Sequence, residues 1–328
     1  MPADDLYEVA DASGAGDWDE FVRGAVGGTV FSTRAWLECA GEATGDRAVS
    51  YGCYRKGQLV AGVSGLERRG GRQLITPPLM PHGGFIHRPV PSDLPSRQES
   101  ERRGETRALV EFLERRYGHV RLTLAPEVAD VREFSWAGWA PAPRYTYVTD
   151  LGCGSGAVWS RLERRTRTVI RKASEAFRFE PAEDLDELVQ LYELVYGGQD
   201  RPPLAGDVVR RFASQARERD LTEAYRVVDG AGRTASVVVF ARGFDTIYAW
   251  VSGADPAFRE SGATSFLYWK LLEQTGFSRF DFVGANLPGI AFFKRGFGGI
   301  LVSYYTVEAF PSRLLKLLAG GRRLLRRS

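Results

Sequence analysis

Residues 280–297 read FDFVGANLPGIAFFKRGF and combine a buried strand, a tight turn and a short helix. Asn286, Pro288 and Gly289 mark the turn, because these residue types favour the backbone angles that turns require. A single lysine, Lys294, stands within the aromatic helical run that follows. An amine among aromatic residues, just after a strand-to-helix turn, makes Lys294 the first candidate for chemistry.

A related unit lies 158 residues earlier in the chain, where residues 120–139 align with residues 278–297 without a gap. The strand VRLTLA corresponds to SRFDFV, and FSWAGW corresponds to FFKRGF. An upstream hairpin also recurs, as residues 51–68 and residues 225–242. The same elements in the same order predict a duplicated α/β unit.

The two copies differ at the position of the lysine. Trp136 occupies in the first copy the place that Lys294 occupies in the second. We therefore predict that the second copy is catalytic, and that the first is non-catalytic and holds substrate. The Gly/Ser stretch LGCGSGA sets the predicted boundary, which gives an N-terminal domain at residues 1–152 and a catalytic domain at residues 153–310.

The composition is that of a soluble globular protein, with 44% apolar and 26% charged residues. No stretch approaches the roughly 20 apolar residues that span a bilayer, and the acidic N-terminus does not resemble a signal peptide. The three cysteines have no paired spacing, so we expect no disulfide framework, no metal site and a cytoplasmic location. The polar residues 92–106 predict a loop that leads into a helix ending at Gly118.

Basic residues are concentrated in two places, although the net charge is only +3. One is the helix predicted around residues 161–178. The other is the tail, residues 311–328, which carries six basic residues and no acidic one. Such zones suit an anionic partner, or they are solvated helix faces. Leucines at helical spacing make the tail suited to anionic lipid at the inner face of the membrane or to an RNA backbone, with a frayed, solvated tail as the alternative.

The second half resembles the GNAT superfamily of acyltransferases, through the order of its elements and the run NLPGIAFFKRGF at residues 286–297. The whole chain resembles the FemABX-like family, which carries two such domains in tandem. FSTRAWLECAG, RTRTVIRKASE and FDFVGANLPGIAFFKRGFGG carry this resemblance. It implies tandem GNAT-like domains, each with a mixed, mainly antiparallel sheet flanked by helices. It also implies transfer of an amino acid from aminoacyl-tRNA to an amine, typically on a peptidoglycan precursor.

The resemblance also implies roles for particular residues. Phe293 and Lys294 look like the family's Phe-Lys pair, whose lysine stabilises charge in the transition state. The basic helix that meets acceptor phosphates is represented by Arg167, Arg171 and Lys172. We expect three further substrate-binding residues, Trp36, Tyr248 and Asn286. The chain lacks the long coiled-coil arm of some members, which loosens the link to the staphylococcal-type bridge enzymes. It also lacks the Arg-Lys-Gly run that many relatives carry in the region of residues 191–203, and this leaves the acceptor open.

The segment RESGAT, residues 259–264, bears on whether the acyl donor is a CoA thioester. Acyl-CoA enzymes of the superfamily use Arg/Gln-x-x-Gly-x-Gly/Ala at a helix start, where backbone N–H groups bind pyrophosphate. Arg259, Gly262 and Ala263 would bind the phosphates of such a donor. Thr264, however, replaces the final small residue with a branched side chain, so the match is partial and the donor stays open.

Amide formation from an ester or thioester needs a neutral amine and stabilisation of a tetrahedral oxyanion. A positive charge beside that oxyanion supplies about 3 to 4 kcal/mol. Lys294 is the natural source, and the flanking Phe292 and Phe293 are predicted to hold it by packing or by cation–π contact. The alternative is a surface lysine that favours the end of a helix. No serine, histidine and acid arrangement is visible, so we expect no covalent intermediate.

Three hypotheses follow for the function. The first is an aminoacyltransferase that uses aminoacyl-tRNA and an amine acceptor, either a cell-wall precursor or a small molecule, without a permanently bound cofactor. The second is an acyl-CoA-dependent N-acyltransferase of the same fold. The third is a non-catalytic module that binds RNA or a membrane through the tail.

Overall fold

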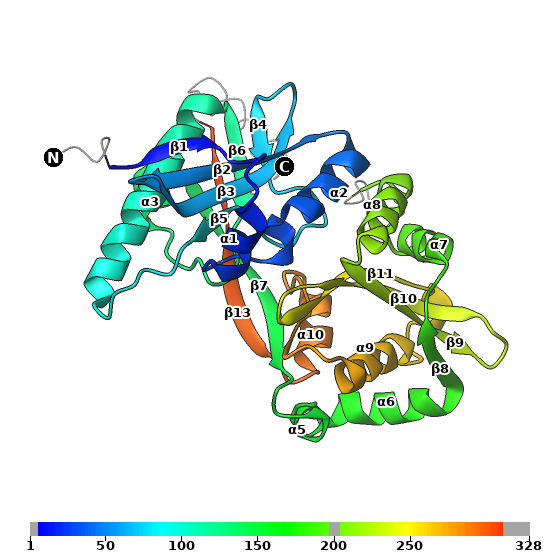
Figure 1. Cartoon of the computed structure of the whole chain (residues 1–328). Helices are drawn as coiled ribbons and strands as arrows, with labels where there is room; N and C mark the ends of the chain where they lie inside the picture. Colours follow the sequence, from blue (N-terminus) through cyan, green and yellow to red (C-terminus); the bar gives the residue numbers. More distant parts are fainter. Residues whose placement is uncertain (1–5, 197–203, 311–328) are drawn as a thin grey trace, which may run out of the picture. The chain divides into compact units, whose positions relative to one another are not determined.

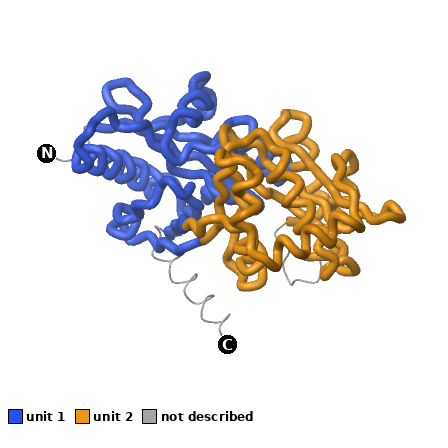
Figure 2. Tube along the Cα trace, turned by 90° about the horizontal axis from the view of Figure 1, so that it is seen from below, with its two compact units in different colours: residues 1–144, 303–328 blue, residues 145–302 orange. Residues whose placement is uncertain are grey.

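The computed structural model describes residues 6–196 and 204–310 (Figure 1). The chain forms two compact units (Figure 2). Unit 1 comprises residues 1–144 and 303–328, and unit 2 comprises residues 145–302. The basic tail predicted at residues 311–328 lies outside the described residues. None of the described helices combines the length and the apolar character that crossing a membrane requires.

Unit 1 is built on a mixed sheet in the order β1-β2-β3-β4-β6-β13, with β5 paired to β3. Strands β4 and β6 are parallel, and the other pairs are antiparallel. The strands are β1 (Glu8–Asp11), β2 (Arg47–Arg55), β3 (Gln58–Arg68), β4 (Gln73–Ile75), β5 (Phe85–His87), β6 (His119–Thr123) and β13 (Ile300–Ala309). The helices are α1 (Trp18–Gly24), η2 (Val30–Ser32), α2 (Arg34–Thr44), α3 (Pro95–Arg116) and α4 (Arg132–Trp136).

Unit 2 repeats this plan in the order β7-β12-β11-β10-β9-β8, with only β11 and β12 parallel among its described strand pairs. The strands are β7 (Ala140–Asp150), β8 (Phe177–Pro181), β9 (Thr222–Asp229), β10 (Thr234–Arg242), β11 (Thr246–Ala254) and β12 (Arg279–Asp281). The helices are α5 (Ser155–Arg161), α6 (Arg164–Ala176), α7 (Leu185–Tyr196), α8 (Gly206–Glu218), η3 (Pro256–Phe258), α9 (Ala263–Gln274) and α10 (Pro288–Arg295).

The predicted fold is confirmed, because both units are mixed, mainly antiparallel α/β structures with the same element order. The β2–β3 hairpin, α3, β6 and α4 of unit 1 correspond to the β9–β10 hairpin, α9, β12 and α10 of unit 2. Helix α3 ends at Arg116 and α9 at Gln274, which preserves the offset found in the sequence.

Each unit takes its last strand from the other copy of the repeat. In unit 1, β13 pairs with β6 and aligns Thr306 with Thr123. In unit 2, β7 pairs with β12 and aligns Asp150 with Arg279. The units therefore divide the chain inside β7 and β13, at residues 144 and 302. The boundary predicted at residue 152 lies instead in the glycine-rich loop after β7, because it was placed where the strand pattern ends.

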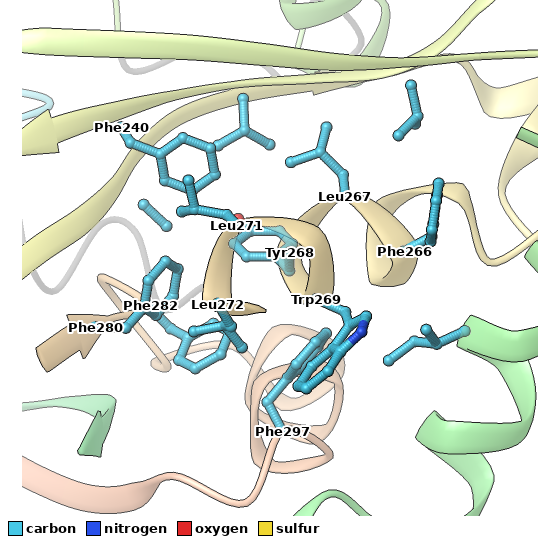
Figure 3. Packing of buried hydrophobic residues seen from close by; sticks show 14 of the residues in the cluster. Phe240, Phe266, Leu267, Tyr268, Trp269, Leu271, Leu272, Phe280, Phe282 and Phe297 are labelled. Atoms are coloured by element: carbon cyan, nitrogen blue, oxygen red, sulfur yellow. The ribbon is translucent and has the colours of Figure 1, made fainter. Parts of the chain in front are cut away.

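The core of unit 2 lies between its sheet and α9 (Figure 3). Phe240 of β10 and Phe280 of β12 meet the central residue of α9, Tyr268, at ring-centroid distances of 6.0 Å each. Helix α6 packs on α9, whereas α7 and α8 lie on the opposite side of β10 and β11 (Figure 1). This packing holds α9 between the sheet and α6.

Candidate active site

Lys294 lies in the last turn of α10, and its ammonium group is held by backbone carbonyls. The amine donates hydrogen bonds to the carbonyl oxygens of Val283 and Gly284, the latter at 2.6 Å. These two residues lie in the turn after β12, separated from the strand by Phe282. Its third N–H makes no hydrogen bond within the described part of the chain, so it can donate to a ligand. The side chain is half-buried.

The carbonyls face the amine because the chain turns sharply after β12. Val283 and Gly284 both have positive φ angles, 51° and 72°. That region is open to glycine but costs free energy for a β-branched residue such as valine. Asp281 holds the turn, since its carboxylate accepts from the Val283 N–H at 2.7 Å and from the Thr146 hydroxyl at 2.5 Å. Asp281 itself is 4% exposed. A strained turn fixed by a buried carboxylate is typical of a functional site.

The surroundings of Lys294 change its acidity. Burial lowers the pKa of its amine to about 8, and the negative charge of Asp281 partly opposes this shift. The amine is therefore mainly charged at neutral pH and loses its proton readily above pH 8. A half-buried lysine with this pKa, held in place and with one N–H to spare, can stabilise an oxyanion.

The two aromatic neighbours of Lys294 do not hold it as expected. Phe293 packs into the core, with ring centroids 5.8 Å from Tyr268 and 5.4 Å from Phe297. It thereby anchors α10 to α9. The Phe292 ring instead faces the guanidinium groups of Arg165 and Arg295. In the described residues the predicted cation–π contact of Lys294 is absent, because the carbonyls of the strained turn take its place.

Of the three phosphate-binding residues predicted on the basic helix α6, one has a structural role and two face solvent. Arg167 donates to the carbonyl oxygens of Ser160, at 3.1 Å, and Leu162, and so fixes the corner after α5. Arg171 is exposed and its guanidinium lies 5.5 Å from the centre of the Trp159 ring. Lys172 is exposed as well. The last two are the ones available to bind phosphate.

Helix α6 also joins the end of α10 to the start of α9. At the α10 end, the Glu163 N–H donates to the carbonyl of Gly296 at 2.9 Å, and the Glu163 carboxylate pairs with Arg295 at 3.0 Å. At the α9 end, a Cβ added to Gly262 would lie 2.5 Å from Val169. The basic helix and the lysine helix are thus parts of one arrangement, which sequence reasoning had treated separately.

The three candidate phosphate-binding residues have other contacts in this structure. Gly262 has a φ of 83° and packs against α6, and this accounts for the glycine without a phosphate. Ala263 is buried, and its N–H donates to the Ser261 hydroxyl at 3.2 Å. Arg259 ends the short helix η3. The start of α9 is therefore packed directly against Val169 of α6.

This packing makes a prediction about stability. Gly262→Ala adds a methyl group against Val169 at a positive φ, and should lower the free energy of unfolding by about 2 to 3 kcal/mol. Gly156→Ala is the matched control, because a Cβ there meets nothing within 4 Å. Urea unfolding followed by circular dichroism measures both. Equal stability of the two variants would show that α6 does not pack on Gly262.

The remaining predicted substrate residues lie in different environments. Tyr248 of β11 pairs in register with Asp281 of β12, so it lies at the end of β12 where the strained turn begins. The side chain of Asn286 accepts from the Tyr145 N–H at 3.0 Å and fixes the turn to β7. Trp36 is fully buried in unit 1 and contacts Phe31, so it belongs to a core rather than to an accessible surface.

Next to the strained turn, β11 continues beyond its parallel partner. The two strands pair only from Thr246 to Tyr248, whereas β11 runs on to Ala254. Beyond Tyr248, β11 has only β10 as a strand neighbour among the described strands. The backbone groups on its other edge are thus available to an extended ligand. This unpaired edge of β11 starts level with the end of β12, close to the turn whose carbonyls accept from Lys294.

Residues 160–295 match the family model described as acetyltransferase (GNAT) domain. No curated protein sequence matches the chain. Among solved structures, FemX is 12% identical, with a TM-score of 0.62 over 88% of this chain and 94% of FemX. A tandem GNAT protein from the clavulanic acid biosynthesis pathway is 11% identical, with a TM-score of 0.56 over 93% and 99%.

A third structure is the C-terminal domain of a putative lysylphosphatidylglycerol synthetase from Agrobacterium fabrum. It is 12% identical, with a TM-score of 0.51 over 84% of this chain and 90% of that domain. At these identities the structures establish a common fold. The family model covers Lys294, α6, α9 and the strained turn.

Proposed function

We propose that the protein transfers an aminoacyl group from aminoacyl-tRNA to an amine. The match of residues 160–295 to the acetyltransferase (GNAT) domain supports an acyltransferase of the GNAT fold. The observation that carries the proposal is the position of α6. This helix packs its Val169 against Gly262 at the start of α9, and it turns Arg171 and Lys172 to solvent. Such an arrangement favours a phosphate chain that runs along the surface.

The reaction needs little from the protein beyond placement and charge. The neutral amine of the acceptor attacks the ester carbonyl of the aminoacyl group and forms a tetrahedral intermediate. The free N–H of Lys294 donates to its oxyanion, and the two carbonyls of the strained turn keep the amine directed. The intermediate collapses to an amide, and the leaving ribose oxygen takes the proton that the attacking amine gives up.

The edge of β11 has a role in this scheme. An aminoacyl group and its acceptor are extended molecules with amide or hydroxyl groups, and these can pair with the edge of residues 249–254 that has no strand partner. Pairing there places the ester carbonyl beside the end of β12. Tyr248 and Asp281 lie at the same level of the sheet.

The test is a transfer assay with radiolabelled aminoacyl-tRNA and a panel of amines, among them a peptidoglycan precursor. We expect a labelled amide that disappears when the tRNA is digested with RNase before the enzyme is added. An acyl-CoA donor with the same amines should give no product. Amide formation from acyl-CoA, or a yield that is insensitive to RNase, would refute the tRNA donor.

The acyl-CoA donor is the second candidate. The family model itself is that of an acetyltransferase domain, and the open edge of β11 would also suit the amide groups of a pantetheine arm. This candidate places the CoA phosphates at the start of α9, where Gly262 packs against α6. It therefore predicts that Gly262→Ala changes the KM for acyl-CoA.

The basic face of α6 gives a further prediction. The double variant Arg171→Ala/Lys172→Ala should weaken tRNA binding about tenfold at low salt and reduce the slope of log K against log salt by about 2, because each residue neutralises one phosphate. The control is Arg210→Ala/Arg211→Ala on α8, whose arginines pair with Asp186 and Asp207. Filter binding at several salt concentrations compares them. An equal effect of both variants would mean that α6 is not the tRNA site.

A further inference from the structure

Unit 2 contains a cleft of about 600 Å³ beside the C-terminal end of α9. One wall is aromatic and includes Phe179 and Tyr225, whose rings stack with centroids 4.8 Å apart. Gln274 and Thr275, at the end of α9, line the other side. None of the lining residues contacts Lys294 or the strained turn, which lie beyond the other end of β12. The cleft is therefore a separate site.

Unit 1 shows how the repeat fills the corresponding space. Tyr117 follows the last residue of α3, and its hydroxyl lies 2.6 Å from the hydroxyl of Tyr51. Tyr117 also donates to the buried carboxylate of Glu67 at 2.5 Å. Arg116 donates to the same carboxylate at 3.1 Å. These side chains close the space between the end of the helix and the hairpin.

The corresponding side chains in unit 2 are too short to close it. Thr275 follows the last residue of α9 and stands 158 residues after Tyr117, and Gln274 stands at the same offset from Arg116. Tyr225 keeps the place of Tyr51 in the second hairpin. The replacement of tyrosine by threonine removes the ring that plugs the first copy, and the cleft results. A cleft that side chains fill in one copy of a repeat, and leave open in the other copy, is a candidate ligand site.

Two complementary polar groups, Arg242 and Glu223, face each other in the cleft as a long ion pair without a hydrogen bond between them. The Arg242 Nε atom is buried and has no hydrogen-bond partner, while another nitrogen of its guanidinium pairs with Asp220. Glu223 lies 3.9 Å from this Nε and makes no hydrogen bond in the described part of the chain. Burial raises the pKa of Glu223, and Arg242 partly opposes the rise. A ligand that brings both a donor and an acceptor would satisfy both groups.

The charges that line the cleft determine where the cationic and the anionic group of such a ligand bind. The C-terminal end of α9 carries the partial negative charge of the helix dipole, and its last residues line the cleft. Together with Glu223 and the aromatic rings it favours an ammonium group. Asp245 also lines the cleft but is paired with Arg279 at 2.6 Å. Arg242 is the cation that an acidic group would meet.

We propose that this cleft binds a free α-amino acid with an aromatic or apolar side chain. Its ammonium group lies between Glu223 and the end of α9, its carboxylate accepts from Arg242, and its side chain packs on the wall of Phe179 and Tyr225. The site is independent of the donor proposed above, because it shares no residue with the reaction site. It makes the second unit a receptor for an amino acid as well as a candidate catalyst.

Isothermal titration calorimetry on the full chain tests the proposal with three probes. L-Phenylalanine carries both charges, phenethylamine lacks the carboxylate, and N-acetyl-L-phenylalanine lacks the ammonium. We expect L-phenylalanine to bind, and each of the other two to bind at least about tenfold more weakly, because each leaves either Arg242 or Glu223 without a ligand group to pair with. Absence of L-phenylalanine binding up to roughly 10 mM overturns the proposal, as does equal binding of phenethylamine.

Two variants locate the site. Thr275→Tyr restores the plug found in unit 1 and should abolish binding, and Glu223→Gln should weaken it about tenfold by removing the charge. Glu218→Gln on α8 is the matched control and should bind as the unaltered protein does. Circular dichroism checks that each variant is folded. Binding that neither Thr275→Tyr nor Glu223→Gln changes would place the amino acid elsewhere and refute the assignment.

Discussion

Lys294→Met should lower kcat by about 10² to 10³, because it removes the positive donor beside the developing oxyanion. Methionine keeps much of the side-chain volume, so the packing of α10 should persist. Affinity for the donor should change little, since the interaction strengthens only in the transition state. Quenched-flow measurement of amide formation at saturating donor gives kcat, and filter binding gives the affinity.

The control is Lys270→Met, which removes an amine from α9 whose described partner is Glu273. Its kcat should stay within a factor of about two of the unaltered rate, as expected for a surface ion pair. Lys294→Met leaves two carbonyls without their donor, so circular dichroism must show a folded protein. Full activity of a folded Lys294→Met would make the lysine a structural residue that only ties down the strained turn.

Asp281→Asn should move the alkaline limb of the pH–rate profile to lower pH. Asp281 raises the pKa of Lys294 against the effect of burial, so removal of its charge lowers this pKa below about 8. Activity depends on the charged amine, and it is lost as pH rises through the pKa. Asn keeps an oxygen that can accept from Val283 and Thr146, which preserves the turn.

Profiles are compared at saturating donor, after correction for the ionisation of the acceptor amine itself. Asp245→Asn is the matched control, because Asp245 pairs with Arg279 at the other end of β12. Its alkaline limb should coincide with that of the unaltered protein. A limb that stays in place in Asp281→Asn, or moves to higher pH, would contradict the coupling between Asp281 and Lys294.

The duplicated fold could be predicted because both copies keep the same offset across a strand, an interval and an aromatic run. It could not be predicted that β7 pairs in unit 2 and β13 in unit 1, because the order of strands along the chain does not determine which sheet each strand joins. Helix α3 was predicted as a loop over residues 92–106 because its first half has no apolar period. Ion pairs such as Arg103–Glu133 and Arg97–Glu101 hold that part of the helix instead.

The site was predictable in part. Lys294 stood out as a charge in an aromatic run, but its carbonyl partners depend on two positive φ angles that a sequence pattern does not show. The sequence does mark Asp281 as unusual, because it is the acidic residue within the apolar strand FDFV. Trp36 was misplaced because an aromatic on the apolar face of a helix is more often core than binding surface.

The central claim is that the turn after β12 holds a lysine of lowered pKa for use in catalysis. NMR titration of the Lys294 amine, with Lys294→Met to assign its signal, tests this most directly. We expect a pKa of about 8 that coincides with the alkaline limb of kcat. A pKa near the ordinary lysine value of about 10.4 would contradict it, as the amine would then be in water rather than enclosed by the turn.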